Sequence, residues 1–148
     1  MLSEALDSLM EGAIENLKHD GEVVPVIFVE ADEQVVVVGL ADFNEKQLMF
    51  EAVGRMFKDK DVTAIATIND AYANSDPTTE MPLKGKPGTT EVLIVTWLPR
   101  PPAKETTIIM QHYTRGADGI ELGEQTKMTN ENAQPHLMQY FWKGYNAD

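Results

Sequence analysis

The sequence contains no cysteine among its 148 residues. This absence excludes disulfide bonds, thiolate-liganded zinc sites and a cysteine nucleophile together. There is also no apolar run of about 18 residues, the length that a helix needs to cross a bilayer. The first residues, MLSEALDSLMEG, carry acids where a secretory signal carries basic residues. We therefore expect a soluble cytoplasmic protein that does not associate with membranes.

Basic residues are few in this chain. Lys and Arg number 12 against 24 Asp and Glu, which gives a formal net charge of −12. Such an excess of negative charge repels the phosphate backbone of DNA and RNA. We therefore expect no nucleic acid partner.

Residues 21–39, GEVVPVIFVEADEQVVVVG, are the most informative stretch that is present. They hold two runs rich in Val, Ile and Phe, separated by the short segment Ala31-Asp32-Glu33-Gln34. β-branched and aromatic residues suit a packed strand, and so short a connection predicts an antiparallel hairpin. Both runs are apolar at successive positions, which predicts contacts on both faces, with helices on one side and another layer or subunit on the other.

Two amphipathic helices are predicted around the hairpin. In residues 2–18 apolar side chains recur at spacings of three and four, and Gly21 follows as a stop. Asp42 precedes a second helix, with Glu45 three residues later as its reciprocal partner in a capping box. The predicted buried face of this second helix comprises Phe43, Leu48, Met49, Ala52, Val53, Met56 and Phe57.

Further strands are predicted at residues 62–69, 90–98 and 106–113, with a short piece at 120–123 after a turn. The order helix, strand, strand, helix and three strands predicts a single α+β domain over residues 1–148. Its sheet would be mainly antiparallel, with about five strands packed with two helices. We expect residues 124–148 to form a C-terminal tail that is either docked on this domain or mobile.

The constellations of well-known catalytic sites are missing. The three histidines, His19, His112 and His136, do not stand at metal-ligand spacings from one another. The element order is similar to that of nucleoside deaminases and JAB/MPN isopeptidases, but the sequence has neither Pro-Cys-x-x-Cys nor His-x-His. It also lacks a dinucleotide fingerprint, a phosphate loop and a nucleophile elbow. We therefore predict no metal site, no cofactor and no assigned catalytic residue.

Four polar residues near predicted strand ends are the best candidates for a ligand site. Asp70 and Tyr72 come directly after the buried strand at 62–69, and Arg115 follows the strand at 106–113. His112, within that second strand, would serve as a lone general base. A structural role is the simpler explanation for Asp70, as part of a turn after the strand, and for His112. The functional interpretation requires all four side chains to converge on one pocket.

Tyr140, Phe141 and Trp142 form a dense aromatic cluster near the C-terminus. Three adjacent aromatic side chains cannot all face one way. The segment therefore either folds back onto the core or docks on another chain, because interface cores are enriched in aromatic residues.

Residues 20–28, DGEVVPVIF, resemble the first strand of a family of small uncharacterised proteins encoded in bacteriophage, prophage and bacterial genomes. Those proteins begin with an amphipathic helix and carry Asp-Gly, a Pro and a Phe before a lysine-bearing second helix. Here residues 44–47, NEKQ, open that helix, while residues 68–72, INDAY, replace the family's acid and aromatic pair. Residues 90–95, TEVLIV, stand where the family has a Glu-x-Leu strand. The resemblance spans most of residues 5–125 and implies a phage or bacterial origin and a shared fold, without a known active site.

These observations favour a small, non-enzymatic accessory protein that binds another protein or associates with itself. A homodimer would cover the second face of the hairpin or the aromatic cluster at residues 140–142. The alternative is a hydrolase or small-ligand enzyme with its site near Asp70, Tyr72, His112 and Arg115. A structural component of a virion is the third hypothesis.

Overall fold

The computed structural model describes residues 1–40, 45–131 and 135–148. Within these ranges the chain forms a single α+β domain, as predicted, with six strands instead of about five and three α-helices instead of two. No helix in them is long and apolar enough to cross a membrane. The elements are η1 (Leu2–Glu4), α1 (Leu6–Asp20), β1 (Val26–Ala31), β2 (Gln34–Gly39), α2 (Lys46–Met56), β3 (Val62–Asn74), β4 (Thr89–Pro99), β5 (Thr106–Gly116), β6 (Gly119–Asn130) and α3 (His136–Tyr145).

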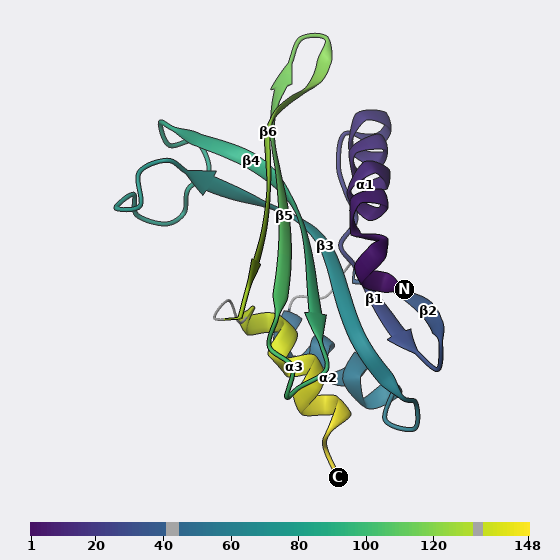
Figure 1. The fold of residues 1–148 in the computed structure, drawn as a ribbon. Coiled ribbons are helices and arrows are strands. Elements are labelled where there is room, and N and C mark those ends of the chain that lie inside the picture. Colours follow the sequence, from purple (N-terminus) through teal and green to yellow (C-terminus); the bar gives the residue numbers. More distant parts are fainter. Residues whose placement is uncertain (41–44, 132–134) are drawn as a thin grey trace.

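All six strands join one antiparallel sheet in the order β2-β1-β3-β4-β5-β6 (Figure 1). The predicted hairpin is confirmed as β1 and β2, joined by a two-residue turn. Asp32 and Glu33 form this turn with φ of 51° and 64°, the left-handed conformation that matches the twist of paired strands. β2 and β6 are therefore the two edges of the sheet.

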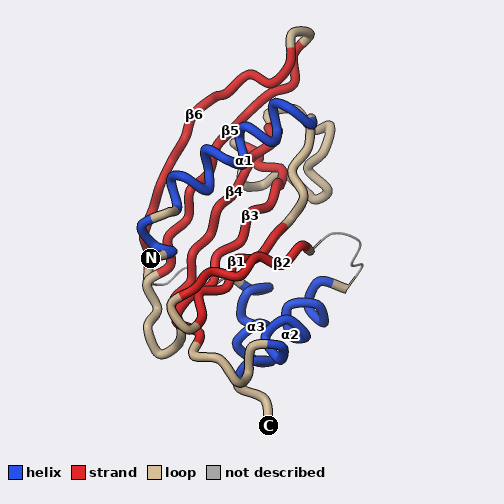
Figure 2. The backbone as a smooth tube through the Cα atoms, turned by 90° about the vertical axis from the view of Figure 1, so that its right-hand side faces the viewer, coloured by secondary structure: helices blue, strands red, loops and turns tan. Residues whose placement is uncertain are grey.

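Helix α1 covers one face of the sheet, as Figure 2 shows. Leu6, Met10, Ala13 and Leu17 are buried at spacings of four, three and four, so they form one stripe along the helix. Gly21 ends the helix with φ of 77°, and its N–H donates to the carbonyl of Leu17. The strand residues in this core cluster are Ala66, Ile68, Leu93, Val95, Ile109 and Tyr113.

Helices α2 and α3 pack on the opposite face (Figure 2). Their buried side chains form a second core cluster with strands β1, β3 and β4. The predicted N-cap Asp42 and the predicted core residue Phe43 lie outside the described residues. The helix is described from Lys46, with Glu45 as its N-cap residue. The main members of the second cluster are Ile27, Val29, Ile65, Leu98, Met49, Phe50, Val53, Phe141 and Trp142.

Two glycines allow α2 and α3 to approach closely. A Cβ atom added at Gly54 would collide with the backbone carbonyl of Phe141. A Cβ atom added at Gly144 would collide with the carbonyl of Glu51. The two helices therefore cross at a point where only glycine fits.

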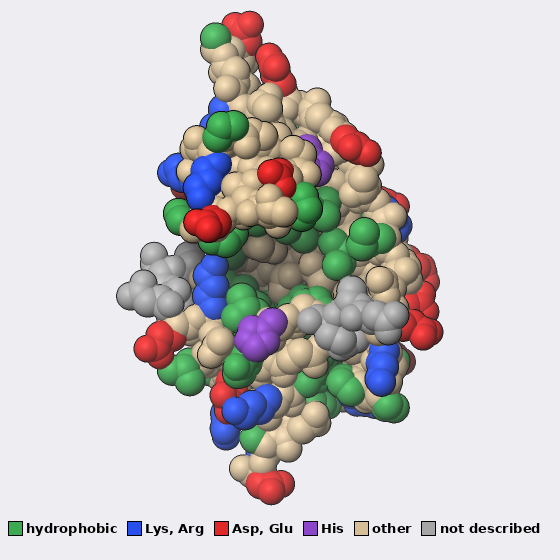
Figure 3. Space-filling model, turned by 90° about the vertical axis from the view of Figure 1, so that its left-hand side faces the viewer, with side chains coloured by type: hydrophobic (Ala, Val, Ile, Leu, Met, Phe, Trp, Pro, Cys, Tyr) green, Lys and Arg blue, Asp and Glu red, His purple; other side chains and the backbone are tan. Residues whose placement is uncertain are grey.

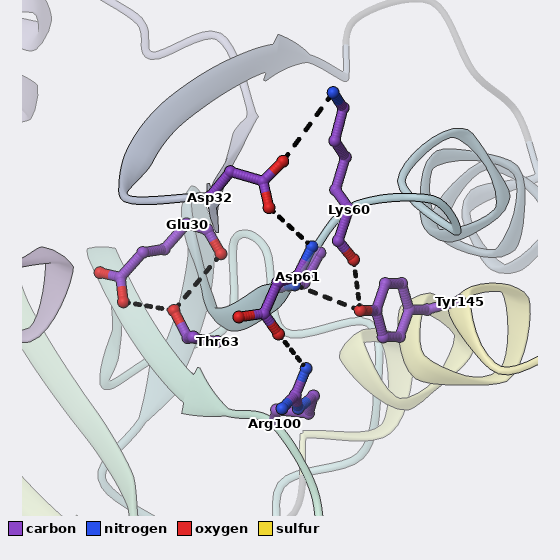
Figure 4. Close-up of polar contacts among 8 residues, drawn as sticks. Glu30, Asp32, Lys60, Asp61, Thr63, Arg100 and Tyr145 are labelled. Atoms are coloured by element: carbon purple, nitrogen blue, oxygen red, sulfur yellow. Dashed lines mark hydrogen bonds and ion pairs between the residues drawn. The ribbon is translucent and has the colours of Figure 1, made fainter.

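Polar contacts fix the C-terminal end of α3 to the sheet (Figure 4). The Tyr145 hydroxyl donates to the Lys60 carbonyl at 2.6 Å and accepts from the Val62 N–H at 3.2 Å. Beside it, Asp61 accepts from the Arg100 guanidinium at 2.7 Å, and its own N–H donates to the Asp32 carboxylate at 3.0 Å. This network joins α3, the start of β3 and the hairpin turn, so α3 has a fixed position over the sheet.

The segment predicted as a tail, residues 124–148, forms the second half of β6 and helix α3, with residues 132–134 outside the description. β6 pairs with β5 along most of its length. Its pattern gives little indication of a strand, because nearly every residue of this edge strand is exposed. The described parts of the segment are therefore docked on the domain.

The two strands of the hairpin differ in burial within this chain, so only the inner strand has contacts on both faces. The predicted contact of the hairpin with another subunit stays a prediction. In β1, Ile27 and Val29 join the cluster under α2 and α3, while Val26 and Phe28 pack against the cluster under α1. In β2, residues 35–37 are all valine and are 40%, 40% and 56% exposed. The inner strand is covered on both faces by helices of the same chain, and the edge strand is not.

Candidate functional site

A hollow of about 610 Å³ lies between the sheet and helices α2 and α3. Figure 3 shows it facing the viewer, bounded by hydrophobic side chains and with basic and histidine side chains at its rim. We call it the central hollow. Its lining residues are Pro25, Leu40, Lys46, Met49, Phe50, Thr67, Ile68, Asn69, Ile94, Thr96, Ile108, Met110, Pro135, His136, Leu137 and Met138.

The floor of the central hollow consists of two rows across β3, β4 and β5. Residues that are directly paired across neighbouring strands share a face of the sheet. The register thus aligns one row as Thr67, Thr96 and Ile108, and the next row as Asn69, Ile94 and Met110.

This floor is only partly covered by the chain itself. Ile94, Ile108 and Met110 are half-buried, although they stand in the middle of long strands. Their neighbours on the other face, Val95 and Ile109, are 0% exposed beneath α1. The sheet therefore presents an apolar surface beneath α2 and α3 that these helices do not fill.

The first turns of α2 and α3 form walls of the hollow. Lys46 and Met49 come from α2, and His136 and Met138 come from α3. The floor residue Thr67 has its hydroxyl 3.7 Å from the sulfur of Met138, which places its row beside the start of α3. Together with Met110, the two wall methionines make the lining adaptable, because methionine has several rotatable bonds and a polarisable sulfur.

Polar groups in the hollow are few: Asn69 and two threonines on the floor, and two side chains on the walls. Thr67 and Thr96 stand side by side on the floor and are each 6% exposed. Lys46 and His136 are exposed and line the hollow from the walls. Few polar groups within an apolar concavity are typical of sites that bind small molecules.

A second, more polar hollow of about 550 Å³ contains two of the predicted site residues, Tyr72 and Arg115. They are exposed and stand around Glu91, which is the cross-strand partner of both Tyr72 and Tyr113. The Arg115 guanidinium donates to Glu91 at 2.9 Å and to the Gly21 carbonyl at 2.7 Å. The charge of Arg115 is thus already paired within the chain. We call this the polar hollow, with Tyr72, Lys84, Glu91, Tyr113 and Arg115 among its lining residues.

Tyr113 is the most perturbed titratable group at the polar hollow. Burial, followed by the negative charges of Glu91 and Asp70, raises the pKa of the Tyr113 phenol from 10.0 to about 12. Arg115, whose guanidinium carbon is 5.7 Å from the centre of the Tyr113 ring, opposes this shift in pKa. The net local field around this phenol therefore disfavours a further negative charge.

The four predicted site residues do not converge on one pocket. Asp70 lies on β3 two residues before Tyr72 and shares its face of the sheet, but it does not line the polar hollow. His112 precedes Tyr113 on β5 and, because strand side chains alternate, points to the opposite face. There its Nδ1 lies 3.0 Å from the Thr90 hydroxyl. The expectation of a single four-residue site is corrected by this alternation, which separates His112 from the other three.

The aromatic cluster near the C-terminus folds back onto the core of its own chain. Phe141 is 0% exposed and Trp142 is 3% exposed, and the two rings meet edge to face at 5.0 Å. Tyr140 is half-buried, with its ring 5.5 Å from that of His136. Phe141 and Trp142 are therefore not accessible to a partner, which corrects the alternative of an interface for these two residues.

Sequence reasoning missed the central hollow. The strand at 90–98 has apolar residues on both faces, which indicates that both faces are covered. This pattern does not show whether the covering elements fill the space above the strand or leave a cavity there. The clearest indication is the pair Thr67 and Thr96, two hydroxyl residues whose direct neighbours along the strands are apolar. Their pairing across β3 and β4 depends on the register, which the sequence does not reveal.

No group of three or more His, Asp or Glu side chains is arranged to hold a metal ion in the described ranges 1–40, 45–131 and 135–148. Comparison of the chain with protein-family models gives no match, and neither the curated proteins nor the solved structures include a significant match to it. The resemblance to a phage and bacterial family therefore stays a prediction, and function must be argued from the site itself.

Proposed function

We propose that this protein binds a small, predominantly apolar molecule in the central hollow. Ligand sites in proteins are typically concavities of about 300–1,000 Å³ with mostly apolar walls and a few placed polar groups. The central hollow, at about 610 Å³, falls within this range. The proposal concerns binding, without a reaction.

The observation that carries the proposal is the half-buried floor. Ile94, Ile108 and Met110 are apolar side chains that α2 and α3 leave partly open to water. A ligand that covers them removes apolar surface from water, which is the main favourable term in binding of this kind. The flexible side chains of Met49 and Met138 would adjust to its shape.

The test uses N-phenylnaphthylamine, a neutral apolar dye whose fluorescence rises when it leaves water. We expect saturable binding to the wild-type protein and loss of most of that binding in Ile94→Trp. The larger indole would occupy the floor, because the side chain at position 94 faces the hollow.

The matched control is Leu122→Trp, which adds the same indole at a position that is 44% exposed on edge strand β6. It should bind the dye as the wild type does. Equal binding by the wild type and by Ile94→Trp would refute the proposal, provided that circular dichroism shows both proteins to be folded.

We propose self-association through the edge strand β2 as a second function. β2 runs from Gln34 to Gly39 without a charged residue, and its valines at 35–37 are 40–56% exposed. Edge strands of soluble proteins usually carry charges, proline or bulges that block further pairing. The other edge, β6, has such protection in Glu121, Glu124 and Lys127 and in a register shift against β5.

A β2 strand can pair with β2 of a second copy in antiparallel orientation and extend the sheet across both chains. Sedimentation of the wild type should then show a dimer, and Val36→Lys should shift it to a monomer. Val24→Lys is the control, because Val24 is 54% exposed but precedes β1. A wild type that stays monomeric at high concentration would exclude this second function.

A further inference from the structure

We infer that the ligand of the central hollow is an anionic amphiphile, a molecule with one carboxylate or similar oxyanion and an apolar chain. This inference rests on the proposed function and names its ligand class. The apolar chain would cover Ile94 and Met110, and the oxyanion would lie where α2 and α3 begin.

The charged side chain that lines the hollow is basic. Lys46 lines it and is exposed, and it forms no ion pair with a described residue. Acids outnumber Lys and Arg by 24 to 12 in this chain, yet no Asp or Glu is among the residues that line the hollow. The exposed ammonium group of Lys46 would therefore attract an oxyanion to the rim of the hollow.

The walls of the hollow include two helix N-termini. The first N–H groups of a helix lack partners within it, and together they carry about half a positive charge. The N-cap residues of α2 and α3, Glu45 and Pro135, make no side-chain hydrogen bond to their helices, and neither first turn contains an acid. In contrast, α1, which starts on the other face, has Asp7 in its first turn. The two helices that border the hollow thus leave donors for an anion.

The floor of the hollow carries a threonine whose hydroxyl has no side-chain partner in the described residues. Thr96 is 6% exposed, lines the hollow and makes no side-chain hydrogen bond with a described residue. It pairs across the strands with Thr67, whose hydroxyl contacts Met138 in the first turn of α3. A polar group that a ligand covers and removes from water needs a new hydrogen-bond partner. An oxyanion held at the start of α3 would supply one for Thr96.

A second apolar concavity, within the described part of the chain, has the opposite charge. A groove of about 420 Å³ beside α1 has Asp20 and Glu22 among its lining residues, and no Lys, Arg or His. An anionic amphiphile would be repelled there, although the apolar surface is available. The central hollow and the groove therefore differ in charge. We expect an anionic ligand to bind in the central hollow and not in the groove.

The experiment compares decanoate with decanol and decyltrimethylammonium by isothermal titration calorimetry, at concentrations at which each is monomeric. We expect decanoate to bind at least about tenfold more tightly than decanol, and the ammonium compound to bind most weakly, since charge-assisted hydrogen bonds favour the anion. The preference for decanoate should shrink at high ionic strength, because the rim is exposed.

Two variants test whether Lys46 causes the preference for decanoate. Lys46→Gln should remove most of the preference for decanoate over decanol. Lys18→Gln removes the same charge from the end of α1, away from the hollow, and should behave as the wild type does.

The possible outcomes tell a failure of the anionic ligand class apart from a failure of the proposed apolar binding site. If decanol and decanoate bind equally and Lys46→Gln changes neither affinity, the anionic ligand class is overturned and the apolar binding site stands. If the ammonium compound binds most tightly, the ligand class is also overturned. If none of the three binds, the proposed function fails together with the inference.

Discussion

The two faces of the sheet differ, although the same strands form both. On the α1 face, Leu93, Val95 and Ile109 are 0% exposed beneath one helix with a regular apolar stripe. On the other face, Ile94 and Met110 stand beside them in sequence and remain half-buried beneath two helices. The two helices pack tightly on each other and cover one end of the sheet.

The α1 face is thus a closed core, whereas the other face keeps apolar strand surface open, where we propose that a ligand binds. A helix that places its stripe along the strands fills the face that it covers, since core packing leaves few voids. Two helices that cross at Gly54 and Gly144 bury their stripes against each other as well as against the sheet. The remaining apolar strand surface is the floor of the central hollow.

The largest expected effect comes from the packing of α3. Phe141 is fully buried between α2, α3 and the sheet, so Phe141→Ala should lower the free energy of unfolding by about 3–5 kcal/mol. Tyr140→Ala at the half-buried neighbour should cost much less. Denaturant unfolding of both variants measures the difference, and similar losses for the two would contradict the placement of this cluster.

A smaller effect is expected from the crossing of α2 and α3. Gly144→Ala should destabilise the protein by roughly 2–3 kcal/mol, because the new methyl group meets the backbone of Glu51, which cannot move aside easily. Gly12→Ala, in the middle of α1 where nothing lies within 4 Å of a new Cβ, should stabilise it by about 0.5–1 kcal/mol. Thermal unfolding of the two variants should thus show shifts of opposite sign, and a gain in stability for Gly144→Ala would refute the close crossing.

The smallest effect is a pH dependence on the α1 face. Below pH 10 Tyr113 is neutral in both the folded and the unfolded state, so it adds no pH dependence. Between pH 10 and about 12 the unfolded state loses the phenolic proton while the folded state keeps it, since the pKa of Tyr113 is raised to about 12. Stability therefore falls as pH rises through this window.

Going from pH 8 to pH 11, the wild type should lose about 1.4 kcal/mol more of its unfolding free energy than Tyr113→Phe does. Urea unfolding of both proteins at the two pH values gives this difference. Parallel losses in the two proteins would show that Tyr113 titrates normally.

The sequence predicted the parts of this fold that depend on local patterns. The stripe from Leu6 to Leu17 and the short turn at Asp32 and Glu33 are local features, and both elements are confirmed. The length of β6 was underestimated, because an exposed edge strand lacks the alternation of buried and exposed residues by which a strand is predicted.

The candidate site was harder to predict because it depends on contacts between distant residues. The central hollow requires the register that pairs Thr67 with Thr96, and it requires α3 to pack against α2. Neither is encoded in a short pattern. The grouping of Asp70, Tyr72, His112 and Arg115 relied on nearness to strand ends, and it failed for His112 because alternation along β5 points that side chain to the other face.

The most direct test of the central claim uses the eight methionines of the chain. Met49, Met110 and Met138 line the central hollow, and the other five do not. In a titration of methyl-labelled protein with decanol, followed by NMR, we predict that the methyl resonances of these three shift together while those of Met1, Met10, Met56, Met81 and Met128 stay in place. Shifts confined to those five, or no saturable shift at all, would contradict a binding site beneath α2 and α3.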